Sequence, residues 1–294
     1  MKDWYKAGEI AKEAKEYGMK LIKPGVLLIE VSEKVEAKIK ELGGKPAFPT
    51  QLSINEIAAH YNPFVNDETK FKEGDLVKLD LGVHINGAVA DIAVTVDLGD
   101  HAALVKASKD ALQAAIDFIK PGVELREVGK VIGETITKAG FNPIRNLGGH
   151  GLELYKVHTS PFIPNFDNGD TTKLEKGDTI AIEPFATDGD GMIYEGKLCD
   201  VYELKEIKPV RDMNSRKLLR FIVEEYKTLP FAKRWLKDKK GYIFALNILE
   251  KQGILHHYPQ LPEKSKGLVS QHEHTVIVGD RVTTLWWYFT ELNA

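Results

Sequence analysis

A weak internal repeat runs through the chain. Lys23-Pro24-Gly25-Val26 recurs as Lys120-Pro121-Gly122-Val123, an offset of 97 residues. Each copy lies between two segments with helical periodicity, residues 5–42 around the first copy and residues 102–139 around the second. In both halves the second helical segment ends at glycine with a proline close behind, which is the usual helix stop. The sequence therefore predicts two similar halves that each begin with a pair of helices.

The repeat continues into strands that carry acidic residues. Residues 74–80 match residues 177–183, because each is a glycine turn that feeds an alternating strand with a carboxylate five residues after a shared aspartate. His60 and His158 are counterparts at nearly the same offset. The order of helices and hairpin strands argues against a doubly wound parallel sheet. We expect an α+β fold in which a pseudo-twofold axis brings both halves to a central cleft.

One hairpin can be assigned residue by residue. Residues 76–85 and 88–97 alternate around Asn86-Gly87, a strong signal for a two-residue turn. If these two residues are the turn, residues whose numbers sum to 173 lie opposite each other. Asp80 and Asp91 are then diagonal neighbours on one face of the hairpin, roughly 7–8 Å apart at the backbone. That separation suits two carboxylates that converge on metal ions.

Three further residues complete a candidate metal-binding set. His150 lies in a glycine-rich segment, and Glu183 and Glu273 lie in or beside apolar strands. The glycine-rich segment lacks the Lys-Ser/Thr of a phosphate-binding loop. With Asp80 and Asp91, the set offers four carboxylates and one imidazole, which suits two divalent ions better than one structural zinc. A two-metal site that activates water indicates hydrolysis.

Composition excludes several other classes of protein. The 294 residues are 43% hydrophobic with a net charge of −3, so the chain can bury a core and has no overall basic footprint for DNA. Cys199 is the single cysteine, and we expect it to be a small apolar strand residue rather than a nucleophile. No apolar run reaches a membrane-spanning length. We expect a cytoplasmic monomer without membrane partners.

The motifs resemble those of the methionine aminopeptidases of the pita-bread fold, specifically their type 2 branch. The resemblance spans nearly the whole chain. The segments that carry it are Lys45-Pro46-Ala47-Phe48-Pro49, Leu52-Ser53-Ile54-Asn55-Glu56, Leu79-Asp80-Leu81-Gly82, Ala90-Asp91-Ile92-Ala93-Val94-Thr95-Val96, Gly149-His150, Ala181-Ile182-Glu183-Pro184-Phe185-Ala186-Thr187 and Glu273-His274-Thr275. It implies a dinuclear centre held by Asp80, Asp91, His150, Glu183 and Glu273, with cobalt, manganese, iron or zinc as the divalent ions.

The type 2 assignment depends on the residues between Glu183 and Glu273. Helical patterns at about 214–227, 231–238 and 241–252 resemble the insertion of that branch in its short archaeal form. We therefore expect a catalytic domain over residues 1–202 and 269–294 and a helical insertion over residues 203–268.

The resemblance also implies roles for individual residues. The substrate would be a peptide or nascent protein with an N-terminal methionine. Glu183 would pass a proton to the leaving amine, and His60 and His158 would hydrogen-bond the developing oxyanion and the peptide backbone. The substrate-binding residues would be His60, His158, Phe48, Val157 and Tyr258, with the last three forming the walls of the methionine pocket.

The sequence departs from the family pattern at three places. His272 replaces a frequent phenylalanine, so that His272 and His274 could hold an extra metal ion. Val201 replaces a histidine found in some relatives, which predicts a less polar pocket wall. Residues 284–289 are unusually aromatic, and we expect them to form strand and core.

Two alternative functions remain open. A proline-specific (Xaa-Pro) peptidase of the same fold would usually carry a large extra N-terminal domain, which a catalytic unit beginning by residue 5 does not favour. A non-catalytic pita-bread module that binds ribosomes or RNA would usually lack metal ligands. The basic residues of the insertion nevertheless predict either a solvated helix face or a transient ribosome contact; they are Lys233, Arg234, Lys237, Lys239 and Lys240.

Overall fold

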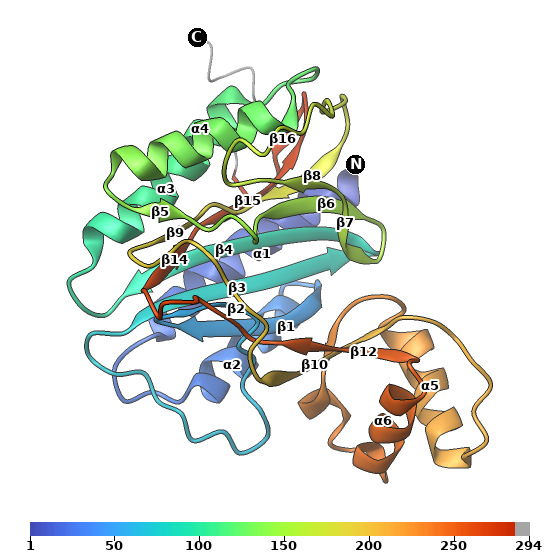
Figure 1. Ribbon diagram of the computed structural model, residues 1–294. Coiled ribbons are helices and arrows are strands. Elements are labelled where there is room, and N and C mark those ends of the chain that lie inside the picture. Colours follow the sequence, from blue (N-terminus) through green and yellow to red (C-terminus); the bar gives the residue numbers. More distant parts are fainter. Residues whose placement is uncertain (286–294) are drawn as a thin grey trace.

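The computed structural model describes residues 1–285 and is built around one large antiparallel sheet (Figure 1). The strand order is β1-β3-β4-β15-β8-β6-β7, with β16 paired to β15. These strands are β1 (Lys45–Ile54), β3 (Leu76–Ile85), β4 (Ala88–Asp97), β15 (Glu273–Ile277), β8 (Thr179–Ile182), β6 (Gly149–Glu153), β7 (Lys156–Ile163) and β16 (Arg281–Val282). Strands from the first half thus lie on one side of β15 and strands from the second half on the other.

Two helix pairs pack against this sheet, one for each half. Helices α1 (Lys2–Leu21) and α2 (Leu28–Glu41) share a core with β3 and β4, in which Leu79 and Leu81 are fully buried. Helices α3 (Ala102–Phe118) and α4 (Leu125–Lys138) share a second core with β8 and β15. Because strand side chains alternate, Asp80, between Leu79 and Leu81, points to the opposite face.

The predicted repeat is visible in matching hydrogen bonds. The Gly25 amide donates to the carbonyl of Phe71, and the Gly122 amide donates to the carbonyl of Leu174 at the same distance of 2.8 Å. Both glycines adopt positive φ angles, 86° and 89°, which explains why the repeated motif needs glycine there. The two halves therefore share their helix-to-helix turn as well as their order of elements.

The predicted hairpin register is confirmed. Strands β3 and β4 pair without a bulge, so that Asp80 faces Ala93 and Gly82 faces Asp91. Asn86 and Gly87 both have positive φ, as a type I′ turn requires. Asp80 and Asp91 consequently lie diagonally on one face of the ribbon.

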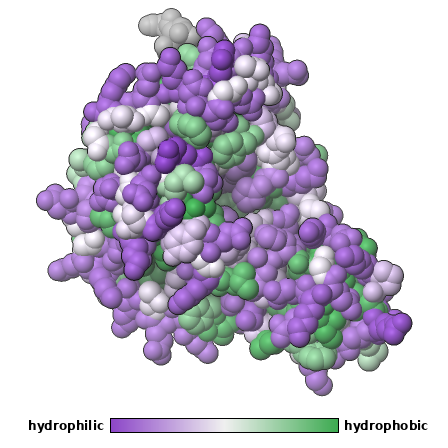
Figure 2. All heavy atoms as spheres, in the orientation of Figure 1, coloured by the Kyte–Doolittle hydropathy of each residue, from purple (hydrophilic) through white to green (hydrophobic). Residues whose placement is uncertain are grey.

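The insertion forms a lobe with its own core beside β1 (Figures 1 and 2). It contains β10 (Leu198–Leu204), β11 (Phe231–Ala232), β12 (Leu255–Pro259), α5 (Met213–Glu225), a 3-10 helix (Lys233–Leu236) and α6 (Tyr242–Lys251). The helix expected over 231–238 was wrong in part, because Phe231 and Ala232 pair with β10 as a short strand. The boundaries at residues 203 and 268 stay a prediction, and the small sheet begins at Leu198.

Short strands join the insertion and the loops to the main body. They are β2 (Ile57–Ala59) with β13 (Leu261–Pro262), and β5 (Asn142–Pro143) with β9 (Phe185–Thr187) and β14 (Val269–Gln271). Within residues 1–285, no helix has the length and apolar character needed to cross a membrane. The aromatic residues 286–289, expected to be strand and core, lie outside the described residues.

Candidate metal centre

The five predicted metal ligands line one cavity of about 400 Å³ on the sheet face that the helices leave open. Asp80 comes from β3, Asp91 from β4, His150 from β6 and Glu273 from β15, while Glu183 directly follows β8. All five are at most 9% exposed. The antiparallel register explains the convergence, since both Asp80 and Glu273 lie opposite Ala93.

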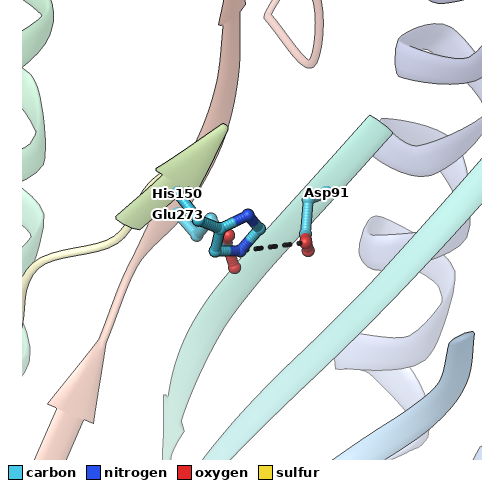
Figure 3. Close-up of side chains that lie close together, drawn as sticks. All are labelled: Asp91, His150 and Glu273. Atoms are coloured by element: carbon cyan, nitrogen blue, oxygen red, sulfur yellow. Dashed lines mark ion pairs between the residues drawn. The ribbon is translucent and has the colours of Figure 1, made fainter. Parts of the chain in front are cut away.

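Three of these residues form the tightest group. Ligand atoms of Asp91, His150 and Glu273 lie within 4.8 Å of one another, and Figure 3 shows their side chains converging from three strands. His150 Nε2 lies 3.7 Å from Asp91 Oδ2 and 3.8 Å from Glu183 Oε1. The imidazole thus faces two carboxylates through one nitrogen, as a metal ligand does.

Within residues 1–285, the ion-pair contacts of the four carboxylates are those with His150, and none involves a lysine or an arginine. Burial raises the pKa of Asp80 to about 7. Burial and then the other acids of the site raise the pKa of Asp91, Glu183 and Glu273 well above the usual range. Carboxylates crowded in this way are strongly unfavourable unless they are protonated or bind a cation.

Unsatisfied oxygens show that the cluster fits a cation. Asp80 Oδ1, Asp91 Oδ1 and Glu273 Oε1 are buried and accept no hydrogen bond. Buried polar atoms are nearly always satisfied in folded proteins, so three orphaned acceptors in one cavity call for a missing partner. Oxygen-rich sites with one imidazole suit divalent ions of intermediate hardness.

Neighbouring groups orient the ligands. His150 Nδ1 lies 3.2 Å from the carbonyl oxygen of Gly151, which leaves Nε2 free to face the carboxylates. Burial lowers the pKa of His150 to about 4, so the ring is neutral at pH 7. The side-chain amide of Gln271 donates to Glu183 Oε2 at 3.0 Å, and the backbone N–H of Asp91 donates to Thr275 Oγ1 at 2.7 Å.

Two more histidines line the same cavity. The ring of His158 lies 4.6 Å from that of His150 and 6.5 Å from that of His60. His60 Nδ1 hydrogen-bonds the carbonyl of Pro259 at 3.1 Å. Burial lowers the pKa of His60 to about 4 and that of His158 to about 3, so both rings are neutral near pH 7. A neutral ring carries one N–H, so His158 can donate to a substrate oxygen, whereas His60 uses its N–H on Pro259 and offers Nε2 as an acceptor.

An apolar pocket adjoins the metal centre. The expected pocket residues Phe48, Val157 and Tyr258 all line the cavity. The Tyr258 hydroxyl donates to Glu203. Gly82, opposite Phe48 in the sheet, leaves room for the ring, because a Cβ there would lie 2.3 Å from it.

Sequence reasoning missed several residues that line the cavity; they are Gln51, Ala59, Leu147, Gly148, Thr159, Phe162 and Pro230. Leu147 and Gly148 belong to the glycine-rich segment around His150, whereas Gln51, Ala59, Thr159 and Phe162 lie in strands β1, β2 and β7, and Pro230 precedes β11. The local sequence does not show which of these side chains reach the cavity, because that depends on packing between distant parts of the chain. Val201 also lines the cavity, in agreement with the prediction of a less polar pocket wall at this position.

His272 and His274 point away from the centre. His272 directly precedes and His274 directly follows Glu273, the first residue of β15, so alternation places both side chains on the face opposite to Glu273. His272 Nδ1 hydrogen-bonds Ser108 Oγ at 2.8 Å, and His274 Nδ1 hydrogen-bonds Thr284 Oγ1 at 2.8 Å. Among the described residues, neither histidine belongs to a group that could hold a metal ion, which argues against the extra metal site.

Comparisons with known proteins agree with this geometry. The model of metallopeptidase family M24 matches residues 3–280. A methionine aminopeptidase of Archaeoglobus fulgidus is 51% identical over 95% of both chains, and one of Pyrococcus abyssi is 51% identical over 92% of this chain and 94% of its own.

Solved structures extend the likeness to the fold. A methionine aminopeptidase from Thermotoga maritima superposes with a TM-score of 0.69 at 28% identity, covering 95% of this chain and 94% of its own. A prolidase from Pyrococcus furiosus covers 63% of this chain and 55% of its own, with a TM-score of 0.56 and 30% identity, so the proline-specific alternative is not favoured. A thermophilic Arx1 shares the fold, with a TM-score of 0.84 at 16% identity over 100% of this chain and 93% of its own. The expected pita-bread fold is confirmed, and the chain belongs to metallopeptidase family M24, among its archaeal-type methionine aminopeptidases.

Proposed function

We propose that this chain removes N-terminal methionine from peptides and nascent proteins at a centre of two divalent ions. The observation that carries the proposal is the cluster of five buried ligand residues with three orphaned oxygens, which adjoins an apolar pocket in one cavity. The metal centre supplies hydrolysis, and the pocket supplies selectivity for a long apolar first side chain. High identity to methionine aminopeptidases over most of the chain supports the same substrate.

The ligand chemistry favours two ions rather than one. Asp91, His150 and Glu273 would hold one ion together with Glu183, since their ligand atoms are close together. Asp80, the diagonal neighbour of Asp91 on the hairpin, would hold the second. Four carboxylates roughly balance the four positive charges of two divalent ions. When bound, the ions lower the pKa of a water and polarise the scissile carbonyl. Cobalt, manganese, iron and zinc all tolerate this ligand set.

Glu183 is the proposed proton carrier. Its Oε2 accepts from Gln271, while its Oε1 faces His150 across 3.8 Å. One oxygen is therefore fixed and the other is directed into the site. Burial, and then the neighbouring acids, raise the pKa of this carboxyl, which suits a group that takes a proton from water and passes it to the leaving amine.

His158 is proposed to donate a hydrogen bond to the developing oxyanion, and His60 to accept one from the peptide backbone through Nε2, because its single N–H is used by the Pro259 carbonyl. Both rings line the cavity beside the metal ligands, and the bond from His60 Nδ1 to Pro259 holds that ring in place. Preoriented donors that meet developing negative charge are often the largest single contribution to catalysis.

A panel of short peptides tests the substrate assignment. Met-Ala-Ser should release methionine rapidly, because its first side chain fills the pocket bounded by Phe48, Val157 and Tyr258. Ala-Ala-Ser should react far more slowly, since one buried methylene contributes about 0.8 kcal/mol and the methionine side chain has two methylenes and a thioether sulfur more than alanine. Amino-acid analysis of the released products measures both. Preferential cleavage of Met-Pro or Ala-Pro over Met-Ala-Ser would instead indicate the proline-specific peptidase.

The predicted ribosome contact, the monomeric state and the cytoplasmic location remain proposals. The structure changes the view of the basic cluster in the insertion. Lys233 pairs with Asp200, Arg234 with Glu36, and Lys237 with Glu33. These acidic partners neutralise three of the five basic side chains, so this cluster is a weaker candidate for binding RNA than its sequence indicated.

A further inference from the structure

A buried ion pair joins the insertion to the first half of the chain. Arg234 of the 3-10 helix is 3% exposed and Glu36 of α2 is 4% exposed. Arg234 Nη1 donates to Glu36 Oε2 at 2.8 Å, and Nη2 also bonds the other carboxylate oxygen. Desolvating two charges costs free energy that hydrophobic side chains of similar size would not cost. A contribution to the stability of the fold is therefore a weak explanation for the presence of such a pair.

On the α2 side, Glu36 also hydrogen-bonds an irregular part of β1. The ladder between β1 and β3 is interrupted on both sides of Phe48. In that interval the Thr50 amide donates to Glu36 Oε1 at 3.1 Å, and Ser32 Oγ donates to the Thr50 carbonyl at 3.0 Å. Side chains of α2 thus replace the sheet partners of Thr50. Bulges of this type redirect neighbouring side chains, and here the neighbours Phe48 and Gln51 line the cavity.

On the insertion side, Arg234 holds the segment that follows His60. Its Nε donates to the carbonyl of Pro63 at 3.3 Å, and Nη2 donates to Asn62 Oδ1 at 3.2 Å. The neighbouring Trp235 Nε1 donates to Glu36 Oε2 at 2.8 Å. One guanidinium therefore binds both α2 and the loop that carries His60.

The 3-10 helix of Arg234 is also connected along the chain to the pocket wall that the insertion forms. The 3-10 helix that contains Arg234 directly follows β11, whose Ala232 pairs with Val201 of β10. Val201, Pro230 and Tyr258 line the cavity from the insertion. Neither Arg234 nor Glu36 lines the cavity itself, and neither is among the proposed metal ligands.

We propose that the Arg234–Glu36 pair is the positioning element of the methionine pocket. It fixes the insertion wall, formed by Val201, Pro230 and Tyr258, against the β1 wall that carries Phe48. The inference rests on the proposed function, since it assigns a residue pair to substrate binding. Loss of the pair should weaken substrate binding and leave the metal centre intact.

The test uses full-length protein loaded with manganese and the substrate Met-Ala-Ser. The double variant Glu36→Leu/Arg234→Met removes both charges, and it should fold because a buried pair can be replaced by apolar residues. Its KM should rise roughly 10-fold, because a pocket whose walls are held less tightly buries less of the methionine side chain. Its kcat and its manganese content should stay close to those of the wild type, because uniform substrate binding affects KM alone.

Two further variants separate positioning from general stability. Arg234→Lys keeps the charge but cannot form the same set of bonds, so its KM should lie between the wild type and the double variant. Lys45→Ala breaks an exposed pair with Glu225 that also joins the insertion to β1, and it should leave KM unchanged.

Each remaining outcome overturns the inference. A folded double variant with wild-type KM, or one in which kcat and manganese content fall as KM rises, would show that the pair does not position the pocket. If the wild type itself released no methionine, the proposed function would fail and the inference with it.

Discussion

Replacing Asp91 by asparagine should lower kcat/KM for Met-Ala-Ser by more than about 100-fold and make the metal-free protein more resistant to heat. Even the outer partners of metal ligands contribute about 10- to 100-fold to affinity or activity, and Asp91 lies at the centre of the cluster. The gain in stability follows from its raised pKa, which burial and the neighbouring Asp80 cause. Steady-state kinetics and thermal unfolding after chelation measure the two effects.

The stability gain should depend on pH. A carboxyl with a raised folded pKa contributes stability below its unfolded pKa, near 4, and that contribution is lost as the pH rises toward the folded pKa. The advantage of Asp91→Asn should therefore be large at pH 8 and close to zero near pH 4. The buried histidines titrate in both proteins, so their effects cancel in the comparison.

A matched control is available on the surface. Asp110 is exposed on α3 and pairs with Lys106, so Asp110→Asn should change neither activity nor the stability of the metal-free protein by much. A metal-free Asp91→Asn protein that unfolds at a lower temperature than the wild type at pH 8 would contradict the view that the site is a cluster of uncompensated acids.

Replacing His158 by alanine should reduce kcat by about 10²- to 10³-fold with the metal content unchanged. The estimate is the usual effect of removing one preoriented hydrogen-bond donor to a developing oxyanion. His158 lies next to His150 by ring distance but is not one of the proposed ligands, so the metal should remain bound. Kinetics and elemental analysis on the same preparation test both parts.

The pH profile adds a second readout. Burial lowers the pKa of His158 to about 3, so the ring stays neutral from pH 5 to pH 9. Removing the ring should lower kcat at every pH without shifting the pH values at which the acidic and basic limbs of the profile fall. His101→Ala provides the control, because His101 pairs with Asp97 and does not line the cavity. A His158→Ala enzyme with normal kcat, or one that loses its metal, would rule out the proposed role.

Much of the fold could be predicted because local signals agreed with the global arrangement. The Asn86-Gly87 turn determines which residues of its two strands are paired, and alternation then places Asp80 and Asp91 on one face. The Lys-Pro-Gly-Val repeat predicted the two halves because glycine is needed at the same positive φ in each. Such features depend on a few neighbouring residues, so a single sequence contains them.

The remaining features depend on contacts between distant segments. The region 231–238 has helical periodicity, yet pairing with β10 makes Phe231 and Ala232 a strand, because tertiary context overrides weak local propensity. Arg234 looked like one member of a basic surface cluster, and its partner Glu36 is 198 residues away. The interruption of β1 around Phe48 likewise depends on side chains of α2. No pattern in the local sequence reveals these partners.

The most direct test of the dinuclear centre is methionine release from Met-Ala-Ser before and after chelation, with divalent ions then added back one at a time. We expect chelation to abolish release and activity to return with manganese, iron, cobalt or zinc. Activity should saturate at about two equivalents of metal, as four carboxylates and one imidazole require. If the folded, chelated protein still releases methionine, or if no ion restores release, the five residues do not form the catalytic metal centre.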